Sequence, residues 1–516
     1  MLVAADLVGG GISSVTLFLS FGVLVVFLLT LVRRGRFVYA LRKIPAPPAA
    51  PLIGNALQLN CAQEDFFYKL LGWSKKYGDI FLLWVGMRPF IWLYRVESVQ
   101  PILSSNLHID KSLEYQYLGH WLGTGLVTSS GEKWHARRKL LTPSFHNGVI
   151  EKYLGSSIRE AAVLVSRLRN EIGKPEFDVV PYTKLAALDI ICDTAMGYQM
   201  NAQTNCNDEY VLAVDKMTSI VQKRFITFWA HPDILFNRTS WAKEQEAALK
   251  IIHDFTNKVI AERKAGSKLR HDGNFNETPK KRQALIDLLL EMAQNGDTLS
   301  NKDVRDEVNT FMFAGHDTVA TSVSWFLYAL GRHPEYQIKI LEEYNSVVGS
   351  DEVTMESLKK LDFLDACMKE CWRLYPSVPL IARQIYQPID IMGTEIPAGS
   401  TVLVNTYLLH RDPRHFPRPE EFYPERFLPD SPKPPTFAFV PFSAGSRNCI
   451  GWKFALMEVK VIILAVLRAF DVRAVEAEKQ LRLMAELVLL NKNGIRLTVT
   501  PRNYDINVSN TGHSAI

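Results

Sequence analysis

A single cysteine lies in a loop whose composition suits a stabilised thiolate. Cys449 belongs to the pattern Phe-x-x-Gly-x-Arg-x-Cys-x-Gly at residues 442–451, which precedes an apolar, helix-like segment at residues 452–469. A thiolate at the start of a helix is stabilised by unsatisfied backbone N–H groups and by the positive end of the helix dipole. Gly445 and Gly451 would let the backbone turn tightly there. A lone cysteine is more often a small buried hydrophobe, so the prediction depends on the pattern around it.

Two pairs of residues have the spacing of neighbours on one helix face. One pair could bind a carboxylate, and the other could form an ion pair. Trp134 and Arg138 are four positions apart, so they share a helix face, and an indole N–H beside a guanidinium can hold a carboxylate. The alternative there is an exposed basic helix. Glu370 and Arg373 are three positions apart and can pair with each other. The alternative there is a solvated surface pair.

These residues need a long element to position them. The sequence predicts a central helix from the capping-box pattern at residues 300–303 to Leu330. Inside it lies Phe-Met-Phe-Ala-Gly-His-Asp-Thr, and a glycine in a helix interior costs about 1 kcal/mol relative to alanine, which suggests a packing or functional reason. The alternative to a functional face is a Gly/Ala groove where two helices cross, with Thr318 bonded to its own backbone. The face in question carries Phe311, Ala314, Gly315, Thr318 and Ser322.

Taken together, the motifs resemble those of the cytochromes P450. The cysteine loop is similar to their haem-thiolate loop, in which the cysteine is the proximal ligand of the haem iron. Trp-x-x-x-Arg is similar to the helix that holds a haem propionate, and Ala-Gly-x-Asp-Thr is the motif of their central helix. Glu-x-x-Arg with a later Pro-Glu-Arg-Phe resembles their structural triad. The resemblance covers about residues 40 to 502 with the motifs in order, and it implies the P450 fold, mainly α with a smaller β part.

The resemblance implies a role for each of these residues. Cys449 would be the axial ligand of the iron, and Thr318 would hydrogen-bond bound oxygen and a water while Asp317 relays protons from solvent. The triad would form a buried network that serves folding and haem retention; it comprises Glu370, Arg373 and Arg426. His410 could join the propionate-binding residues, with an ordinary structural histidine as the alternative. The other predicted propionate-binding residues are Trp134, Arg138, Arg383 and Arg447, and those facing the substrate are Phe311, Ala314 and Gly315.

Several motifs are characteristic of P450 family 4, and the likeness is greatest to its animal V and insect C branches. They are Phe-Met-Phe-x-Gly-His-Asp-Thr, Pro-Ser-Val-Pro and the full cysteine loop. Many family-4 enzymes have a glutamate, esterified to a haem methyl, where this chain has Ala314. Alanine cannot form that ester, so we expect non-covalent haem b. Without the ester the pocket would be less rigid, which predicts a broader spread of ω and ω-1 products.

The implied activity is that of a monooxygenase, an oxidoreductase that inserts one atom of O₂ into a C–H bond of a lipophilic substrate. Electrons would come from NADPH through a flavoprotein P450 reductase, with cytochrome b5 as a further donor. Fatty acid hydroxylation at or near the ω end is the expected reaction, and terpenoids, hormones or xenobiotics are alternative substrates. A basic face for the reductase is expected, with ordinary solvated charges as the alternative; it would comprise Lys133, Arg137, Lys139 and Lys453.

Three other functions are compatible with parts of the sequence. A P450-type isomerase or dehydratase acts on peroxides without a reductase and often lacks the threonine, so Thr318 argues against it. A haem-binding sensor without turnover is disfavoured by the Asp317–Thr318 pair. A membrane scaffold that has lost haem would give no haem absorption with carbon monoxide.

The N-terminus predicts a membrane anchor. Residues 12–32 form a segment without charged side chains, and this segment is long enough for a transmembrane helix of about 20 residues. Arg33, Arg34 and Arg36 follow it. Positive charge after the span places the following chain in the cytosol, and a cleaved signal peptide is the alternative. We therefore expect a single-pass protein of the endoplasmic reticulum membrane. Its parts would be a lumenal segment 1–11, an anchor 12–32, a basic and proline-rich hinge 33–55, a catalytic domain 56–502 and a disordered tail 503–516.

Composition excludes some classes of protein. The chain has 516 residues, 47% of them hydrophobic, and a net charge of +5, which is too small to suggest nucleic acid but is compatible with membrane lipid or an acidic partner. The six cysteines are scattered and too few for a disulfide scaffold in a chain this long.

Shorter elements are predicted from local patterns. Residues 80–84 and 90–94 are expected to form strands. Residues 485–490 and 495–500 are expected to form a hairpin through Asn493-Gly494, a frequent turn sequence. The polar stretch 265–282 is expected to be an exposed loop.

Overall fold

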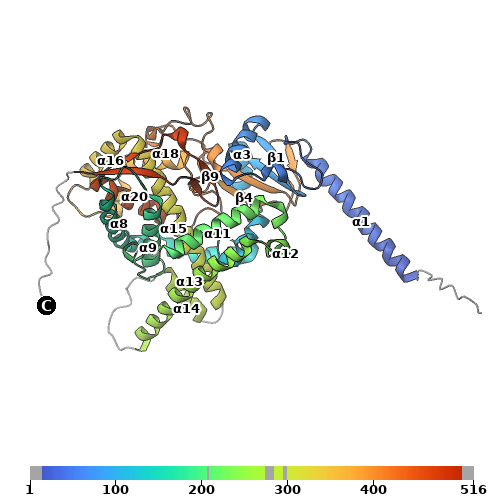
Figure 1. Cartoon of the computed structure of the whole chain (residues 1–516), viewed down its shortest axis with the longest axis horizontal. Helices are drawn as coiled ribbons and strands as arrows, with labels where there is room; N and C mark the ends of the chain where they lie inside the picture. Colours follow the sequence, from blue (N-terminus) through green and yellow to red (C-terminus); the bar gives the residue numbers. More distant parts are fainter. Residues whose placement is uncertain (1–13, 206–207, 273–283, 295–298, 503–516) are drawn as a thin grey trace, which may run out of the picture.

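The computed structural model describes residues 14–205, 208–272, 284–294 and 299–502. The predicted lumenal segment 1–11 and the predicted tail 503–516 lie outside these residues. A helix-rich part that contains α8, α9 and α20 lies at one end of the molecule, and a sheet-containing part with α3 and β1 lies at the other (Figure 1). The helix α1 projects from the sheet-containing end.

The longer helices occur in both parts of the molecule. They are α1 (Ser14–Leu41), α3 (Gln63–Tyr77), α4 (Val96–Leu103), α6 (Gly131–Leu141), α8 (Leu154–Leu168), α9 (Val180–Thr194), α11 (Glu209–Ile226), α13 (Ser240–Asp272), α14 (Leu285–Gln294), α15 (Asn301–Arg332), α16 (Pro334–Val347), α18 (Asp362–Leu374) and α20 (Trp452–Ala469). The strands are β1 (Ile80–Val85), β2 (Arg88–Leu93), β3 (Phe177–Asp178), β4 (Leu380–Gln384), β5 (Ile389–Ile391), β6 (Thr394–Ile396), β7 (Thr401–Asn405), β8 (Phe470–Ala474), β9 (Leu483–Ala485), β10 (Leu489–Asn491) and β11 (Arg496–Pro501).

The predicted central helix is α15, and it begins where the capping box placed it. Ser300 Oγ accepts from the backbone N–H of Asp303 at 3.1 Å, and the Asp303 carboxylate accepts from the N–H of Ser300 at 3.0 Å. The helix is buried on nearly all sides. Between Asp306 and Gly331 the only residues that are not buried are Ala314, Gly315 and Thr318.

The largest sheet has the strand order β1-β2-β7-β4, in which β2 and β7 are parallel and the other pairs are antiparallel. Alternate side chains of a strand point to opposite faces. Leu82 therefore packs with Leu41, the last residue of the anchor helix, and with Ile44 just after it. Phe81 and Leu83 pack with α3 on the other face of the sheet. The sheet thus holds the end of α1 on one side and α3 on the other.

The anchor helix is longer than the predicted span. α1 continues nine residues beyond Val32, so the first part of the predicted hinge is helical. Its segment Phe18–Leu41 is long and apolar enough to cross a membrane, which indicates a membrane-anchored protein. Arg34 donates to the carbonyl of Met87 and lies 5.0 Å from the Trp84 ring, so the helix contacts the β1–β2 turn.

Two local predictions are wrong. The segment 485–490 does not pair with 495–500: β10 pairs with β9, and β11 pairs with β8 and β3. Gly494, with φ of 72°, packs against the Asp178 carboxylate, which directs the chain into the other sheet. Residues 265–272, predicted as loop, continue α13, and residues 273–282 of the same predicted loop lie outside the described residues.

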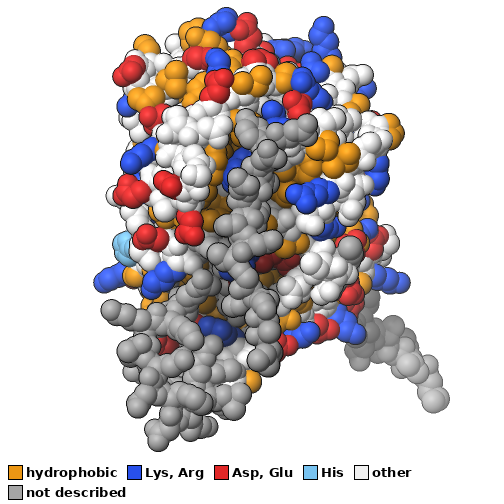
Figure 2. Space-filling model, turned by 90° about the vertical axis from the view of Figure 1, so that its left-hand side faces the viewer, with side chains coloured by type: hydrophobic (Ala, Val, Ile, Leu, Met, Phe, Trp, Pro, Cys, Tyr) orange, Lys and Arg blue, Asp and Glu red, His pale blue; other side chains and the backbone are white. Residues whose placement is uncertain are grey.

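The end of the molecule opposite α1 carries charges of both signs. Figure 2 shows Lys and Arg side chains interspersed with Asp and Glu on this face, without a large region of one sign.

Candidate active site

The cysteine loop is held by a short network of backbone bonds. The N–H of Cys449 donates to the carbonyl of Phe442 at 2.9 Å, and that of Asn448 donates to Gly445 at 3.1 Å. Gly445 has φ of 69°, and a Cβ there would collide with the carbonyl of Leu103, so glycine is required. Gly451 has φ of −91°, so the predicted need for glycine does not arise from its backbone conformation.

The thiol of Cys449 is accessible even though protein surrounds it. Its side chain is exposed, yet burial raises the pKa of the thiol above its usual value, against the Gly451 N–H and Arg138, which lower it. A group with both properties lies on the wall of an internal space. Desolvation is the larger effect on the free thiol, while the Gly451 N–H at the start of α20 and Arg138 favour the thiolate. A bound cation at the sulfur would reverse this balance.

Arg138 ties the helix α6 to the cysteine loop. Its two terminal nitrogens donate to the backbone carbonyl and to the side-chain oxygen of Asn448, each at 2.7 Å. Trp134, one turn earlier, is buried, and the guanidinium of Arg447 lies 4.5 Å from its ring. The residue that stacks on Trp134 is therefore Arg447.

Positive charge gathers beside this stack, and Asp110 offsets only part of it. Burial and, to a smaller extent, the neighbouring Arg383 lower the pKa of Arg447 to about 9. Burial also lowers the pKa of Arg383, and it lowers that of Lys111 well below its usual range, with both arginines contributing. Among the described residues none of the three forms an ion pair with a carboxylate. Nη2 of Arg447 donates to the carbonyl of Ser129 at 2.7 Å, but Nη1 is buried without a partner.

The structure brings Glu370, Arg373 and Arg426 together. Two guanidinium nitrogens of Arg373 donate to the Glu370 carboxylate at 2.7 and 2.8 Å, and Nε of Arg426 donates to it at 3.1 Å. Glu370 and Arg373 are completely buried. The N–H of Tyr423 completes the set of donors to Glu370 at 2.8 Å, so the carboxylate is fully satisfied away from water.

For His410 the structure favours the structural alternative. The N–H of Val440 donates to its Nε2 at 2.9 Å, and its Nδ1 donates to the carbonyl of Trp372 at 3.3 Å. Both ring nitrogens are therefore used by the backbone. Burial lowers the pKa of His410 to about 3, so the ring is neutral and offers no N–H to an anion.

The small-residue face of α15 packs against α9 at Gly315 and remains partly exposed at Ala314 and Thr318. A Cβ on Gly315 would lie 2.7 Å from Ile191 of α9, so the absence of a side chain there is needed for helix crossing and does not open space for substrate. Phe311 is buried and stacks on Phe145 at 5.5 Å. Ala314 remains partly exposed beside Thr318, whose hydroxyl donates to the Ala314 carbonyl at 2.7 Å. The oxygen of Thr318 keeps its capacity to accept a hydrogen bond.

Comparison with known proteins decides the family. The profile of the family described as cytochrome P450 matches residues 44–499. Cytochrome P450 4c3 of Drosophila melanogaster is 42% identical over 512 residues, which cover 96% of both chains. Cytochrome P450 4V2 of Homo sapiens is 43% identical over 477 residues, which cover 90% of this chain and 91% of the relative.

The chain belongs to the cytochrome P450 family. Its similarity to cytochromes P450 4c3 and 4V2 places it in family 4, as the cysteine loop and the central-helix motif predicted. It is a P450 monooxygenase, an oxidoreductase with a haem-thiolate cofactor, and the family implies a reductase partner and a lipophilic substrate.

The residues of this P450 fit a haem. The buried Arg383 and Arg447 and the partly exposed Lys111, with the Nη1 of Arg447 that has no partner among the described residues, are the donors that two propionate groups would satisfy. Cys449 presents an accessible thiol to the interior. Lys111 was missed in the sequence because no helical or motif spacing relates it to residues that lie more than 250 positions away.

A second set of residues missed in the sequence surrounds Asp317. This carboxylate is buried, and its Oδ1 lies 3.2 Å from Nζ of Lys184 in an ion contact that lacks hydrogen-bond alignment. Lys184 also pairs with Asp215, whose side chain is 42% exposed. Burial would lower the pKa of Lys184, but the two carboxylates outweigh it and raise that pKa above its usual value.

Glu486 of the β9–β10 turn belongs to the same cluster. It accepts from the Thr218 hydroxyl at 3.1 Å and from the Gln63 amide at 2.7 Å. Burial raises its pKa to about 7, and the charges of Asp215 and Asp317 contribute to the increase. The cluster thus joins α9, α11, α15 and the turn, and its charge changes near neutral pH.

Two residues of the predicted basic face have internal partners. Arg137 is buried and lies 2.8 Å from the Asp303 carboxylate, and Lys133 contacts the same carboxylate at 2.8 Å. Both therefore link α6 to the start of α15. Lys139 is exposed. Lys453 is partly exposed and donates to Asn147 at 2.9 Å. Of the predicted basic face, these two lysines are the ones without a carboxylate partner among the described residues.

Replacing Glu370 with glutamine should prevent stable haem incorporation. The change leaves the Arg373 and Arg426 guanidinium groups buried without a counter-charge, which typically costs about 3–5 kcal/mol. We expect a large loss of haem absorption of the carbon monoxide complex per milligram of protein. Glu356→Gln is the matched control, because Glu356 and Lys359 have the same i, i+3 spacing but are exposed. Normal haem content in Glu370→Gln would contradict the structural role of the network.

Proposed function

We propose that this P450 hydroxylates fatty acids at or near the ω end, with electrons from NADPH through P450 reductase. Membership of family 4, many of whose members act on fatty acids, is the observation that carries the proposal. Phe313, which precedes Ala314, packs on Trp121 at 4.5 Å, and Leu122 and Leu126 belong to the same apolar core.

The chain's own residues would hold the cofactor and move protons. Cys449 would bind the haem iron, and Arg383, Arg447, Lys111 and Trp134 would surround the propionates. Bound haem supplies O₂ activation and the oxidation of the C–H bond. Asp215, Lys184 and Asp317 form a chain of contacts from a half-exposed carboxylate to the buried residue before Thr318. Protons would enter along this chain, and the Thr318 hydroxyl would accept a hydrogen bond from the last water.

We infer the location and partners from the anchor and the charges. A single-pass anchor in the endoplasmic reticulum membrane, with residues 56–502 as a cytosolic catalytic domain, would follow from α1 and the arginines after it. Membrane lipid would contact the anchor. Lys139 and Lys453 would contribute to the surface that meets the reductase, and cytochrome b5 would be a further electron donor.

The proposed function is tested with the purified full-length chain, P450 reductase and NADPH. We expect ω- and ω-1-hydroxylated fatty acids, formed only when reductase and NADPH are both present. A panel of terpenoids serves as the comparison. Conversion of terpenoids alone would favour the alternative substrate class, and turnover of lipid hydroperoxides without reductase would favour an isomerase.

Ala314 should leave the haem unlinked. Denaturing acid extraction is expected to release all haem from the wild-type chain, whereas Ala314→Glu should retain a fraction through an ester. Ala314→Gln is the control of equal size that lacks the carboxyl group. The haem-linked variant should also give a higher ω to ω-1 ratio, because the pocket becomes more rigid. Haem that stays on the wild-type polypeptide would overturn the prediction.

Lys184→Met should impair proton delivery without preventing substrate binding. Removal of the ammonium group leaves Asp317 buried without its counter-charge and breaks the contact with Asp215. We expect about a tenfold lower kcat, roughly the effect of removing one proton-transfer group, with a larger solvent isotope effect and an unchanged spectral binding constant. Lys184→Arg should restore most of the rate. Lys216→Met, which removes an exposed ion pair with Glu244, is the control; an equal loss in that variant would exclude a specific role for Lys184.

A further inference from the structure

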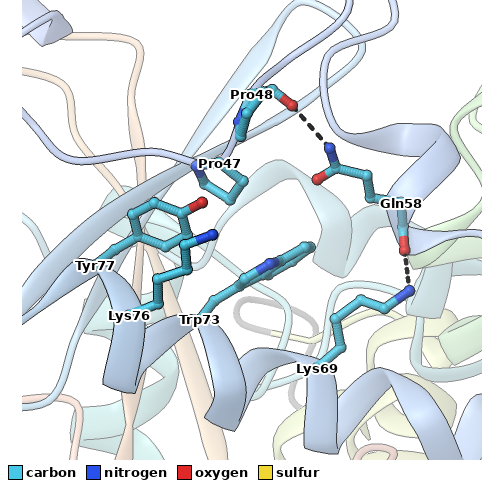
Figure 3. Close-up of a pocket in the computed structure, with 7 residues that line it drawn as sticks. All are labelled: Pro47, Pro48, Gln58, Lys69, Trp73, Lys76 and Tyr77. Carbon is cyan, nitrogen blue, oxygen red and sulfur yellow. Dashed lines mark hydrogen bonds between the residues drawn. The ribbon is translucent and has the colours of Figure 1, made fainter.

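A pocket outside the active site lies between α3 and the linker that follows the anchor helix. Its volume is about 340 Å³. Pro47 and Pro48 form one side, and four side chains of α3 form the other. These are Lys69, Trp73, Lys76 and Tyr77, which lie on one helix face at i, i+4, i+7 and i+8 spacing. Figure 3 shows the two lysines at opposite ends of the pocket, with the Trp73 ring between them.

The pocket carries positive charge that the described chain does not neutralise. Lys69 donates to the backbone carbonyl of Gln58, and Gln58 in turn donates to the Pro48 carbonyl at 2.8 Å, so these three residues are fixed relative to one another (Figure 3). An ammonium group has three N–H donors; Lys69 uses one on Gln58 and a second on the Cys61 side chain, and keeps the third for a ligand. Neither Lys69 nor Lys76 forms an ion pair with a carboxylate in the part of the chain that the structure describes, and no lining residue is acidic.

The pocket is continuous with the part of the protein next to the anchor. Pro47 and Pro48 follow α1 by six and seven residues, and the same linker contains two strongly exposed apolar side chains, Leu52 at 78% and Leu57 at 66%. Exposed leucines beside a membrane anchor are suited to acyl chains. Tryptophan and tyrosine are the aromatic residues that prefer the head-group region of a bilayer, and basic side chains there attract anionic lipids.

We propose that this pocket binds the head group of an anionic phospholipid. The phosphate would lie at one of the two lysine amines and a second anionic group of the head group, such as the carboxylate of phosphatidylserine, at the other; the glycerol and ester region would contact Trp73 and Tyr77, and the acyl chains would extend over Leu52 and Leu57. A soluble phosphate ester would share the amine contacts but not the apolar ones. The proposal rests on membrane anchorage by α1 but not on the substrate or the redox partner.

Lipid retention by the full-length haem protein tests this assignment. The protein is reconstituted in nanodiscs of equimolar phosphatidylserine and phosphatidylcholine, released into mild detergent and analysed by native mass spectrometry. The wild-type chain is expected to retain one phosphatidylserine with about fivefold preference over phosphatidylcholine, the factor that one basic residue contributes near an anionic surface. Lys69→Gln/Lys76→Gln should lose the preference and keep the carbon monoxide spectrum of the wild type.

The control variant Lys75→Gln/Lys479→Gln removes the same charge from two exposed lysines outside the pocket. It should retain the lipid as the wild type does. Equal retention of both lipids by the wild type, or an equal loss in the control, would overturn the proposal. Thermal unfolding with dihexanoylphosphatidylserine against free O-phosphoserine separates the two sources of phosphate. An upward shift with the lipid alone supports the proposal, and an equal shift with both contradicts it.

Discussion

Arg383 and Arg447 place two basic groups inside the protein beside the partly exposed Lys111; in the described chain none of the three has a carboxylate in ion-pair contact, and Asp110 offsets the charge of the arginines only in part. Desolvating a charge without a partner costs several kcal/mol, so this arrangement is stable only with an anion beside it. A haem brings two carboxylates to the same interior that Cys449 faces. Cofactor binding and stability are then one equilibrium, because the group that satisfies the arginines is the group that the cysteine binds.

Other buried charges are balanced by groups of the chain itself. Glu370 receives donors from two arginines and a backbone N–H, so its charge is balanced inside the chain itself. Asp317 lies between these extremes, since one lysine serves both it and the half-exposed Asp215. The three sites thus differ in how completely the polypeptide pairs its own charges.

Features fixed by local spacing could be predicted from the sequence. The capping box at Ser300, the central helix, the first two strands and the Glu370–Arg373 contact all depend on residues a few positions apart, and the order of the motifs indicated the family. Features that depend on distant chain segments could not. Lys184 reaches Asp317 from another helix, and the size limit at Gly315 is imposed by Ile191. The net pKa shift of Cys449 depends on how much protein surrounds the loop, and the turn at Gly494 is directed by Asp178.

The continuity of α1 has a mechanical consequence. The helix runs without interruption from its apolar span to Leu41, which is completely buried in the core on one face of the large sheet. A flexible linker at the membrane surface would let the domain change its orientation independently of the anchor. A continuous helix whose end is buried in the domain couples the orientation of the domain to that of the anchor. A bilayer of different thickness changes the tilt of a spanning helix, and here that tilt would turn the whole domain. The angle at which the molecule stands over the membrane is therefore set partly by the lipid and partly by the packing of one leucine.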